Sequence, residues 1–388
     1  MPQSNPTVRI GVVAGEMSGD LLGARLMAVL QQRLPAVEFE GIGGPEMVAR
    51  GCRTLFPMER LSVLGLTEVL GRYRELHAIR SQLRRHFLQH PPDVFIGIDS
   101  PGFNLGLELA LRRAGIRTVH YVSPQVWAWR SYRVHKIRKA VDRILTLYPF
   151  EEEFYRKHEV PVEFVGHPLA DEIPQEVNRD EVRARLKLPL DRTLVALLPG
   201  SRVSELRAHA DVFVQTALWL HDRHPDMQFI LPFVNRETRQ IFEDAIKRHS
   251  AWDLPLTRLH GHSRDALGAA DVALLASGTA ALEALLIKRL MVVTYRVSRI
   301  SYVLIKMFSH IRRYSMPNNL AGRALVPELL QGDAVPRKLG MEVEYQLTHP
   351  GLASETLATF GQIHAQLRRG ASKRAADAVM QVLGRSAT

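Results

Sequence analysis

Short apolar segments alternate along the chain with longer amphipathic ones, and this alternation is the strongest constraint on the fold. Strand-like segments in the first half include "VRIGVVAG", "DVFIGID", "RTVHYVS" and "RILTLY", with helical segments beginning near Asp20 and Phe103. The alternation restarts with "TLVALLPGSR", "MQFILPF", "DVALLASGT" and "LMVVTY". Strands joined by crossover helices form parallel sheets. The sequence therefore predicts an α/β fold with two Rossmann-like, doubly wound domains.

A segment rich in proline and charge, residues 166–192, interrupts the alternation and predicts an interdomain connection with one short helix. The 388 residues also exceed what one hydrophobic core comfortably fills. We expect a first domain over 1–170, a linker over 171–192, a second domain over 193–335 and a helical tail over 336–388. Ligands of such sheets bind at the carboxyl ends of the strands, which we expect to face a central cleft.

Charge and cysteine content limit the possible cellular compartments and binding partners of the protein. The formal net charge is +11, which favours anionic partners such as phosphates, nucleic acid or acidic lipid, although a solvated surface with extra arginine explains it equally well. The single Cys52 excludes an intramolecular disulfide, and the amino terminus has no signal-peptide pattern. No run reaches the roughly 18 apolar residues of a spanning helix. We expect a cytoplasmic protein whose membrane contact, if any, is peripheral.

In the second half, Gly200, Ser201 and Arg202 follow a strand and precede a helix that begins near Val203. Backbone N–H groups and the helix dipole at such a turn form an anion site, and an arginine adds a charge-assisted hydrogen bond. The sequence predicts a phosphate-binding turn. An ordinary turn with a surface arginine is an equally weighted alternative.

The stretch "LLASGTAALEALL" ends another apolar strand in Ser277, Gly278 and Thr279, with Glu283 one turn further on. We expect Ser277 to cap the helix, while Gly278 and Thr279 offer N–H groups to a ligand. A carboxylate at Glu283 accepts hydrogen bonds and suits the two hydroxyls of a ribose. Together the two strand ends predict half of a nucleotide pocket, against the alternative of a capped helix with a solvated glutamate.

In the first half, polar residues also follow strands. Glu16 follows the first strand, and Asp99 and Asn104 follow the strand "DVFIGID". A carboxylate facing the crevice could deprotonate a sugar hydroxyl, contributing about 10²–10⁴-fold to the rate. The alternative is that Asp99 and Asp20 cap helices. Since a Pro-Gly pair separates Asp99 from the next helix, the catalytic interpretation is favoured for Asp99.

Motifs for metal or nucleotide hydrolysis are absent from the sequence. It contains no D-x-D, no G-x-x-x-x-G-K-[ST] and no C-x-x-C, so we expect neither a metal nor another cofactor.

Two basic, amphipathic stretches are candidates for membrane contact. They are residues 299–313, with Leu304 and Phe308 on the apolar face, and residues 61–73. The apolar side chains of the second stretch are Val63, Leu64, Leu66, Val69 and Leu70. Such helices can lie in an anionic membrane interface, and core-facing amphipathic helices are the alternative.

Seven motifs in this order resemble those of lipid-A-disaccharide synthases, bacterial glycosyltransferases of endotoxin assembly. They are "AGEMSGD", "IDSPGFN", "YVSPQVWAWR", "FVGHPLAD", "LLPGSR", "ASGTAALE" and "MPNNLAGRALVPELLQ". The resemblance spans most of the chain and implies a GT-B fold. It also implies inverting, metal-independent transfer of 2,3-diacylglucosamine from UDP to 2,3-diacylglucosamine 1-phosphate. We expect a peripheral protein on the cytoplasmic face of the inner membrane, with a tail that packs back on the first domain or is exchanged in a homodimer.

The resemblance also implies roles for individual residues. Asp99 matches the essential aspartate, taken as the base, with Glu16 as the alternative. Arg202 matches the arginine that neutralises departing UDP, and Glu283 takes the ribose role. Polar positions near the donor are matched by Asn318 and Gln331, although Asn319 stands where the family has an apolar residue and leaves open which asparagine faces the donor.

Two other function classes remain as alternatives. A UDP-sugar 2-epimerase, or a transferase with a soluble acceptor, would need the same nucleotide pocket but no apolar patch. A non-catalytic basic protein that binds RNA or membranes would bind with a steep salt dependence and would not need Asp99. The motif string favours the synthase, without a nucleic-acid partner.

Overall fold

The computed structural model describes residues 7–61, 66–297 and 313–385. They form two compact units. The first comprises Met1–Asp171 and Leu367–Thr388, and the second comprises Glu172–Gln366. Among the described residues, no helix is both long enough and apolar enough to span a bilayer.

The first unit is built on a parallel sheet with strand order β3-β2-β1-β4-β5-β6-β7. Its strands are β1 (Val8–Ala14), β2 (Val37–Ile42), β3 (Cys52–Thr54), β4 (Val94–Ile98), β5 (Arg117–Tyr121), β6 (Arg143–Thr146) and β7 (Val162–Phe164). Its helices are α1 (Met17–Arg33), α2 (Pro45–Ala49), α3 (Leu66–Gln89), α4 (Pro101–Arg113), α5 (Val134–Ala140), α6 (Pro149–Lys157) and α17 (Ala371–Val382). Because helices cover both faces of the sheet, central strands such as β4 are buried along their whole length.

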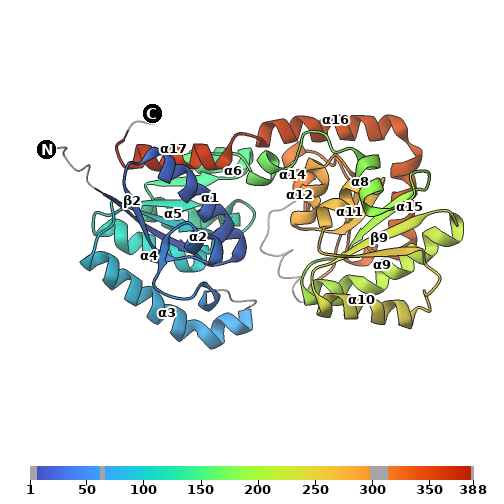
Figure 1. Cartoon of the computed structure of the whole chain (residues 1–388), viewed down its shortest axis with the longest axis horizontal. Coiled ribbons are helices and arrows are strands. Elements are labelled where there is room, and N and C mark those ends of the chain that lie inside the picture. Colours follow the sequence, from blue (N-terminus) through green and yellow to red (C-terminus); the bar gives the residue numbers. More distant parts are fainter. Residues whose placement is uncertain (1–6, 62–65, 298–312, 386–388) are drawn as a thin grey trace. The chain divides into compact units, whose positions relative to one another are not determined.

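Helix α17 belongs to the first unit although it comes about two hundred residues after the rest of it. It lies beside α1, as Figure 1 shows. The carboxylate of Asp171 caps its start by accepting the N–H groups of Gly370 and Ala371, at 2.8 and 2.6 Å. The apolar face of α17 packs into the core of this unit through Ala371, Ala375, Ala376, Ala378, Val379 and Met380.

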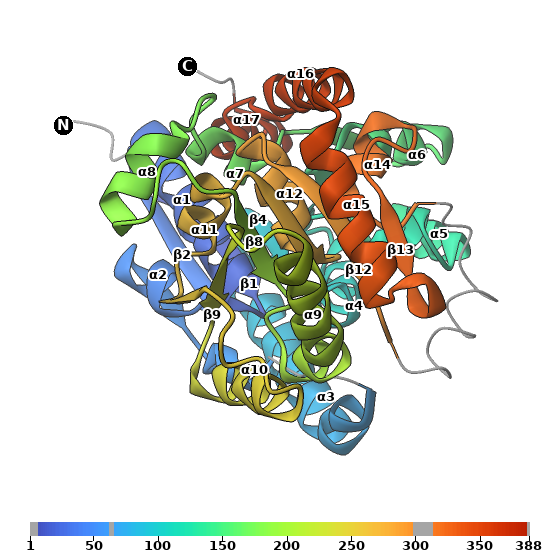
Figure 2. The same cartoon turned by 90° about the vertical axis from the view of Figure 1, so that its right-hand side faces the viewer.

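The second unit is built on a parallel sheet with strand order β10-β9-β8-β11-β12-β13. The strands are β8 (Leu194–Leu198), β9 (Gln228–Phe233), β10 (Leu256–His260), β11 (Val272–Ala276), β12 (Leu290–Tyr295) and β13 (Glu328–Leu330). The helices are α8 (Arg179–Leu186), α9 (Val203–Arg223), α10 (Arg236–Arg248), α11 (Ser263–Ala269), α12 (Thr279–Leu286), α14 (Met316–Ala321), α15 (Pro336–Thr348) and α16 (Pro350–Leu367). In Figure 2, α9 packs between α10 and α15, while α11 packs against α8 and α12.

The two parallel sheets confirm the predicted α/β fold, but three predicted details differ. The connecting segment contains two short helices, α7 (Pro168–Glu172) and α8, where one was expected. Asn178 caps α8 by accepting the N–H groups of Asp180 and Glu181. The first long helix begins at Met17, before Asp20. The predicted helical tail, residues 336–388, is divided between the units: α15 and most of α16 belong to the second unit, and α17 belongs to the first.

Candidate functional site

The carboxyl ends of β1 and β4 bring two predicted carboxylate loops together. The strands are neighbours in the sheet, with Ala14 paired to Ile98. A Cβ added to Gly15 would lie only 2.2 Å from the Oγ of Ser100, so the loop after β1 passes directly over the loop after β4. Glu16 follows Gly15 and is exposed, and Asp99 precedes Ser100. The prediction that these carboxylate-bearing loops share one sheet edge is confirmed.

Asp99 occupies a strained position. Both Asp99 and Ser100 have left-handed backbone, with φ of 51° and 44°. The N–H of Asp99 donates to the carbonyl of Tyr121 at 2.8 Å. Its carboxylate forms no hydrogen bond or ion pair with any residue that the structure describes. Strained residues of this kind concentrate at functional sites.

The helix-capping alternative is wrong for Asp99 and right for Asp20. The N-cap residue of α4 is Ser100. Asp20 lies buried within α1, and its carboxylate accepts the N–H groups of Gly44, Glu46 and Met47 at 2.8–3.0 Å. Asp20 therefore caps α2, a different helix from the one expected.

Asn104 does not lie on the acceptor side as expected. It is fully buried, and its Nδ2 donates to the carbonyls of Val13, Ile98 and Asp99. A side chain that is fully buried, with its amide N–H groups held by backbone carbonyls, cannot reach a bound sugar. Its position one turn into α4 points it into the core, which the motif "IDSPGFN" did not reveal.

The loop after β5 belongs to the same edge, and its residues were missed from the sequence. Val122 has a φ of 78°, a conformation that β-branched residues rarely adopt. Nearby Glu151, buried at the start of α6, accepts the N–H groups of Leu147 and Tyr148, both at 3.2 Å. Burial raises the pKa of Glu151 to about 8, against the effect of its hydrogen bonds. The motif "YVSPQVWAWR" marked this loop but gave no residue a role.

In the second unit, the predicted phosphate-binding turn joins β8 to α9. Gly200 has a φ of 128°, and a Cβ there would lie 2.5 Å from the Cβ of Glu205. The Glu205 carboxylate accepts the N–H groups of Ser201 and Arg202, at 2.9 and 3.2 Å. A carboxylate thus already occupies the anion position at the start of α9. Arg202 is exposed and lies 3.4 Å from Glu205. A glutamate three residues after the N-cap position could have signalled this half of a capping box, in which Glu205 accepts the N–H of Arg202.

The turn between β11 and α12 differs from its prediction in one residue. The N-cap is Gly278, whereas Ser277 donates through Oγ to the carbonyl of Tyr314 at 2.9 Å. Gly278 and Thr279 are exposed. Glu283 accepts from Nε of Arg264 at 2.9 Å and from Oγ of Ser263 at 3.3 Å. The strand order places this turn next to the Gly200 turn, because β8 and β11 are neighbours.

The predicted polar residues near the donor lie around β13. Asn318 is buried and bonds the backbone of Leu325 and Val326 as well as Glu328. Asn319 donates to backbone carbonyls at 313 and 315. The amide of Gln331 faces the backbone of Val297, accepting its N–H at 3.0 Å and donating to its carbonyl at 3.2 Å. The hydrogen bonds of Asn318 are therefore made within its own loop.

The apolar side chains predicted to contact a membrane are not among those that the structure describes. Val63, Leu64, Leu304 and Phe308 lie outside the described residues, as do the side chains of Leu66, Val69 and Leu70. Within the described part of the chain, no three His, Cys, Asp or Glu side chains gather so that they could hold a metal ion.

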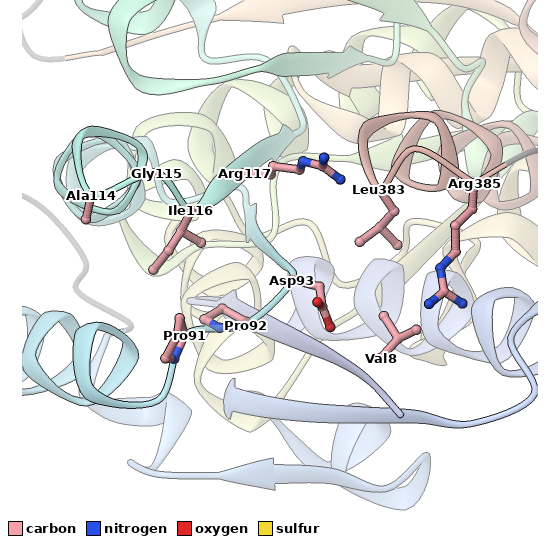
Figure 3. Close-up of a pocket in the computed structure, with 10 residues that line it drawn as sticks. All are labelled: Val8, Pro91, Pro92, Asp93, Ala114, Gly115, Ile116, Arg117, Leu383 and Arg385. Carbon is pink, nitrogen blue, oxygen red and sulfur yellow. The ribbon is translucent and has the colours of Figure 1, made fainter. Parts of the chain in front are cut away.

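Figure 3 shows a cavity of about 400 Å³ at the amino ends of β1, β4 and β5, lined by residues that include Asp93, Arg117 and Arg385. It lies at the edge of the first sheet opposite to Asp99. Asp93 accepts the N–H of Arg9 there, at 2.8 Å. The catalytic candidates of the first unit are therefore not part of this cavity.

Residues 10–382 match the family model described as Lipid-A-disaccharide synthetase. A lipid-A-disaccharide synthase of Azotobacter vinelandii is 51% identical, over 98% of this chain and 99% of its own length. One of Dechloromonas aromatica is 50% identical, over 97% of this chain and 99% of its own.

Solved structures with low sequence identity share the fold. A UDP-GlcNAc 2-epimerase from Neisseria meningitidis, bound to UDP-GlcNAc, superimposes with a TM-score of 0.65 at 12% identity, covering 96% of this chain and all of that one. MurG of Acinetobacter baumannii gives a TM-score of 0.60 at 13% identity, covering 97% and 100%. Both likenesses support the GT-B fold.

Proposed function

The chain belongs to the lipid-A-disaccharide synthase family, and on that premise we propose how its residues divide the reaction. The enzyme is a glycosyltransferase that moves 2,3-diacylglucosamine from UDP to the 6-hydroxyl of 2,3-diacylglucosamine 1-phosphate. The products are a β-1′,6-linked tetraacyl disaccharide 1-phosphate and UDP. Family membership sets aside the epimerase and the non-catalytic basic protein.

We assign the general base to Asp99. The observation that carries this assignment is a carboxylate that pairs with none of the described residues and lies on a strained turn at the carboxyl edge of the first sheet. In the reaction, the acceptor 6-oxygen attacks the anomeric carbon while its proton passes to the Asp99 carboxylate. The bond from that carbon to the β-phosphate oxygen breaks, and UDP leaves with the electron pair. Attack opposite to the leaving group inverts the anomeric configuration. Glu16, on the neighbouring loop, is the alternative base.

We place UDP at the neighbouring turns of the second unit. Arg202 and the N–H groups after Gly200 and Gly278 would stabilise the negative charge that develops on the diphosphate. This requires the Glu205 carboxylate to leave the N–H groups of Ser201 and Arg202. The positive charge that stabilises the departing diphosphate then comes from the guanidinium of Arg202 and two helix dipoles. We therefore expect transfer without a metal ion.

Glu283 would hold the ribose. Its carboxylate has about four lone-pair sites, and Arg264 and Ser263 use two of them. The remaining sites can accept the two ribose hydroxyls. Asn318 and Gln331 would act indirectly, by fixing the loops that border this side of the sheet.

The decisive test is turnover in detergent with EDTA, using the two diacylglucosamine substrates and mass spectrometry of the products. We expect the tetraacyl disaccharide phosphate from the wild type. In Asp99→Asn we expect a loss of about 10²–10⁴-fold in kcat with unchanged UDP affinity. Loss of UDP affinity in Asp99→Asn would contradict its placement on the acceptor side, and loss of wild-type turnover in EDTA would contradict the metal-free mechanism.

We also propose that the first unit docks on the anionic cytoplasmic surface of the inner membrane. Support comes from a basic face, defined here as residues 129–139 with Arg112 and Arg113. Residues 129–139 contain five Lys or Arg and no acidic residue, and they expose Trp129 (41%) and Tyr132 (68%). A hollow of about 710 Å³ in this face is lined by Leu109, Arg112, Arg113, His135, Arg138 and Lys139. Aromatic side chains beside basic ones suit a headgroup region.

Sedimentation with phosphatidylglycerol vesicles tests this face. Reversing charge in Lys136→Glu with Lys139→Glu should weaken binding by roughly 30-fold or more, at about 1 kcal/mol for each lost cation. The matched control is Arg236→Glu with Lys247→Glu, two exposed positions on α10 of the other unit. Equal losses in both pairs would contradict a localised docking face.

A homodimer with exchanged carboxyl-terminal segments is a further proposal. It is supported by the way α17 completes the first unit from a distant part of the chain. Arg33 and Asp377 form an ion pair between α1 and α17, so cysteines at these two positions report on the exchange. Disulfide-linked dimers would support exchange, whereas a disulfide within a single chain would contradict it.

A further inference from the structure

The turn that carries Asp99 does not hold its shape through local sequence. Asp99 and Ser100 are consecutive left-handed residues, and neither is glycine. L-residues avoid this conformation because Cβ approaches the following carbonyl oxygen. Such a turn persists only where surrounding groups fix it from several sides. The N–H of Asp99 is fixed to the carbonyl of Tyr121, on the neighbouring strand.

The carbonyl of Asp99 is fixed by Asn104. The Nδ2 of Asn104 lies 2.8 Å from this carbonyl and 3.3 Å from the carbonyls of Val13 and Ile98. Two amide hydrogens therefore serve three acceptors, one on each of the two adjacent strands and one on the turn itself. Because Val13 belongs to β1, the same amide also restrains the strand that leads into Glu16.

Room for this contact comes from Gly97 on β4. A Cβ on Gly97 would lie 2.9 Å from the Cβ of Asn104 and 2.0 Å from Oε1 of Glu108. Glu108, one turn after Asn104 on α4, meets Nδ1 of His120 at 2.7 Å, and both side chains are fully buried. His120 lies beside Gly97 in the sheet register. The pair fixes the rotation of α4 against β5, which keeps Asn104 directly beneath the turn.

We propose that Asn104 is a positioning residue, whose amide holds the left-handed turn that aims the Asp99 carboxylate at the acceptor hydroxyl. Asn104 touches no substrate and acts only through Asp99. The inference rests on the proposed role of Asp99 as the base. A carboxylate on a relaxed turn would keep its chemistry but lose its alignment, and misplacement by about 1 Å can lower the rate of such a step by roughly a hundredfold.

The test compares Asn104→Ala and Asn104→Asp with the wild type in steady-state kinetics with both substrates. We expect kcat to fall about 10- to 100-fold in both variants, with unchanged KM for the UDP-sugar and unchanged UDP affinity. Asn104→Asp matters because it keeps the shape of the side chain but replaces the amide donor by a carboxylate, which repels the three carbonyls that the amide holds. Asn104→Ser serves as the second variant if either protein is unfolded at the assay temperature, since a serine hydroxyl can bond its own helix backbone.

The matched control is Thr118→Val, on β5 of the same sheet. Thr118 is also fully buried and donates to the carbonyl of Ala140 at 2.8 Å, near the amino ends of the strands and opposite to Asp99. It should lose melting temperature without losing kcat. If the Asn104 variants lose melting temperature and keep kcat, or if Asn104→Asp retains wild-type kcat, the positioning role is wrong. If Asp99→Asn itself keeps kcat, the proposed base is wrong, so the two failures are distinguishable.

Discussion

His167, in the motif "FVGHPLAD", is neutral because it is buried. Its Nδ1 accepts the N–H of Leu169 at 3.1 Å at the start of α7, and burial lowers the pKa of the imidazole to about 4. Between about pH 6.5 and 4 the unfolded chain binds a proton that the folded chain does not, so stability falls as the pH falls through this window.

We expect His167 to contribute a loss of roughly 3 kcal/mol in the free energy of unfolding from pH 7 to pH 4. His167→Asn keeps an acceptor for the Leu169 N–H but cannot be protonated, so its acid sensitivity should be smaller. Urea unfolding at several pH values measures both. An identical pH slope in wild type and variant would show that His167 is not the group that titrates.

The start of α9 shows how a helix can bind its own carboxylate where an anionic ligand should bind. Glu205 stabilises the empty helix by accepting the first N–H groups, and it places a negative charge where a diphosphate would lie. Release of this capping box therefore accompanies UDP binding in the mechanism proposed above.

Glu205→Gln should bind UDP about two- to five-fold more tightly, since the amide removes the negative charge at the helix start. The helix itself should become slightly less stable. Isothermal titration with UDP measures the affinity, and Glu237→Gln, in the first turn of α10, is the matched control because it also lies at a helix start but not at the predicted nucleotide turn. Weaker UDP binding by Glu205→Gln would mean that Glu205 helps to hold Arg202 in place.

Because the chain divides into two compact units, we expect the unfolding of each unit to be measurable as a separate transition. Trp127 and Trp129 lie in the first unit, and Trp219 and Trp252 lie in the second. A ligand stabilises only the unit that binds it, by about 2.7 kcal/mol at a concentration of one hundred times Kd. UDP should therefore raise the melting temperature of the second unit alone.

Ala375→Asp should have the opposite selectivity. It places a charge in the core of the first unit, where Ala375 is fully buried, and should lower the melting temperature of that unit only. Lys373→Asp, on the exposed side of α17, is the control. Calorimetry measures both transitions, and a shift of the second transition in Ala375→Asp would contradict the assignment of α17 to the first unit.

The sequence by itself determined the two parallel sheets, the family and the strand ends at which Asp99, Gly200 and Gly278 lie. These features follow from local patterns, namely the period of the apolar residues and the motifs at the strand ends.

Only the tertiary structure decided which polar side chains remain free for a ligand. Asn104 and Asn318 look like site residues in the sequence, but both are buried and bonded to backbone groups. The amide of Asn104 reaches the carbonyl of Val13, and the amide oxygen of Asn318 accepts the N–H groups of Leu325 and Val326. The buried Glu108–His120 pair, which joins α4 to β5, had no predicted role. The physical reason is that hydrogen-bond partners depend on which segments meet in space, and a local pattern contains no information about segments that are distant in sequence.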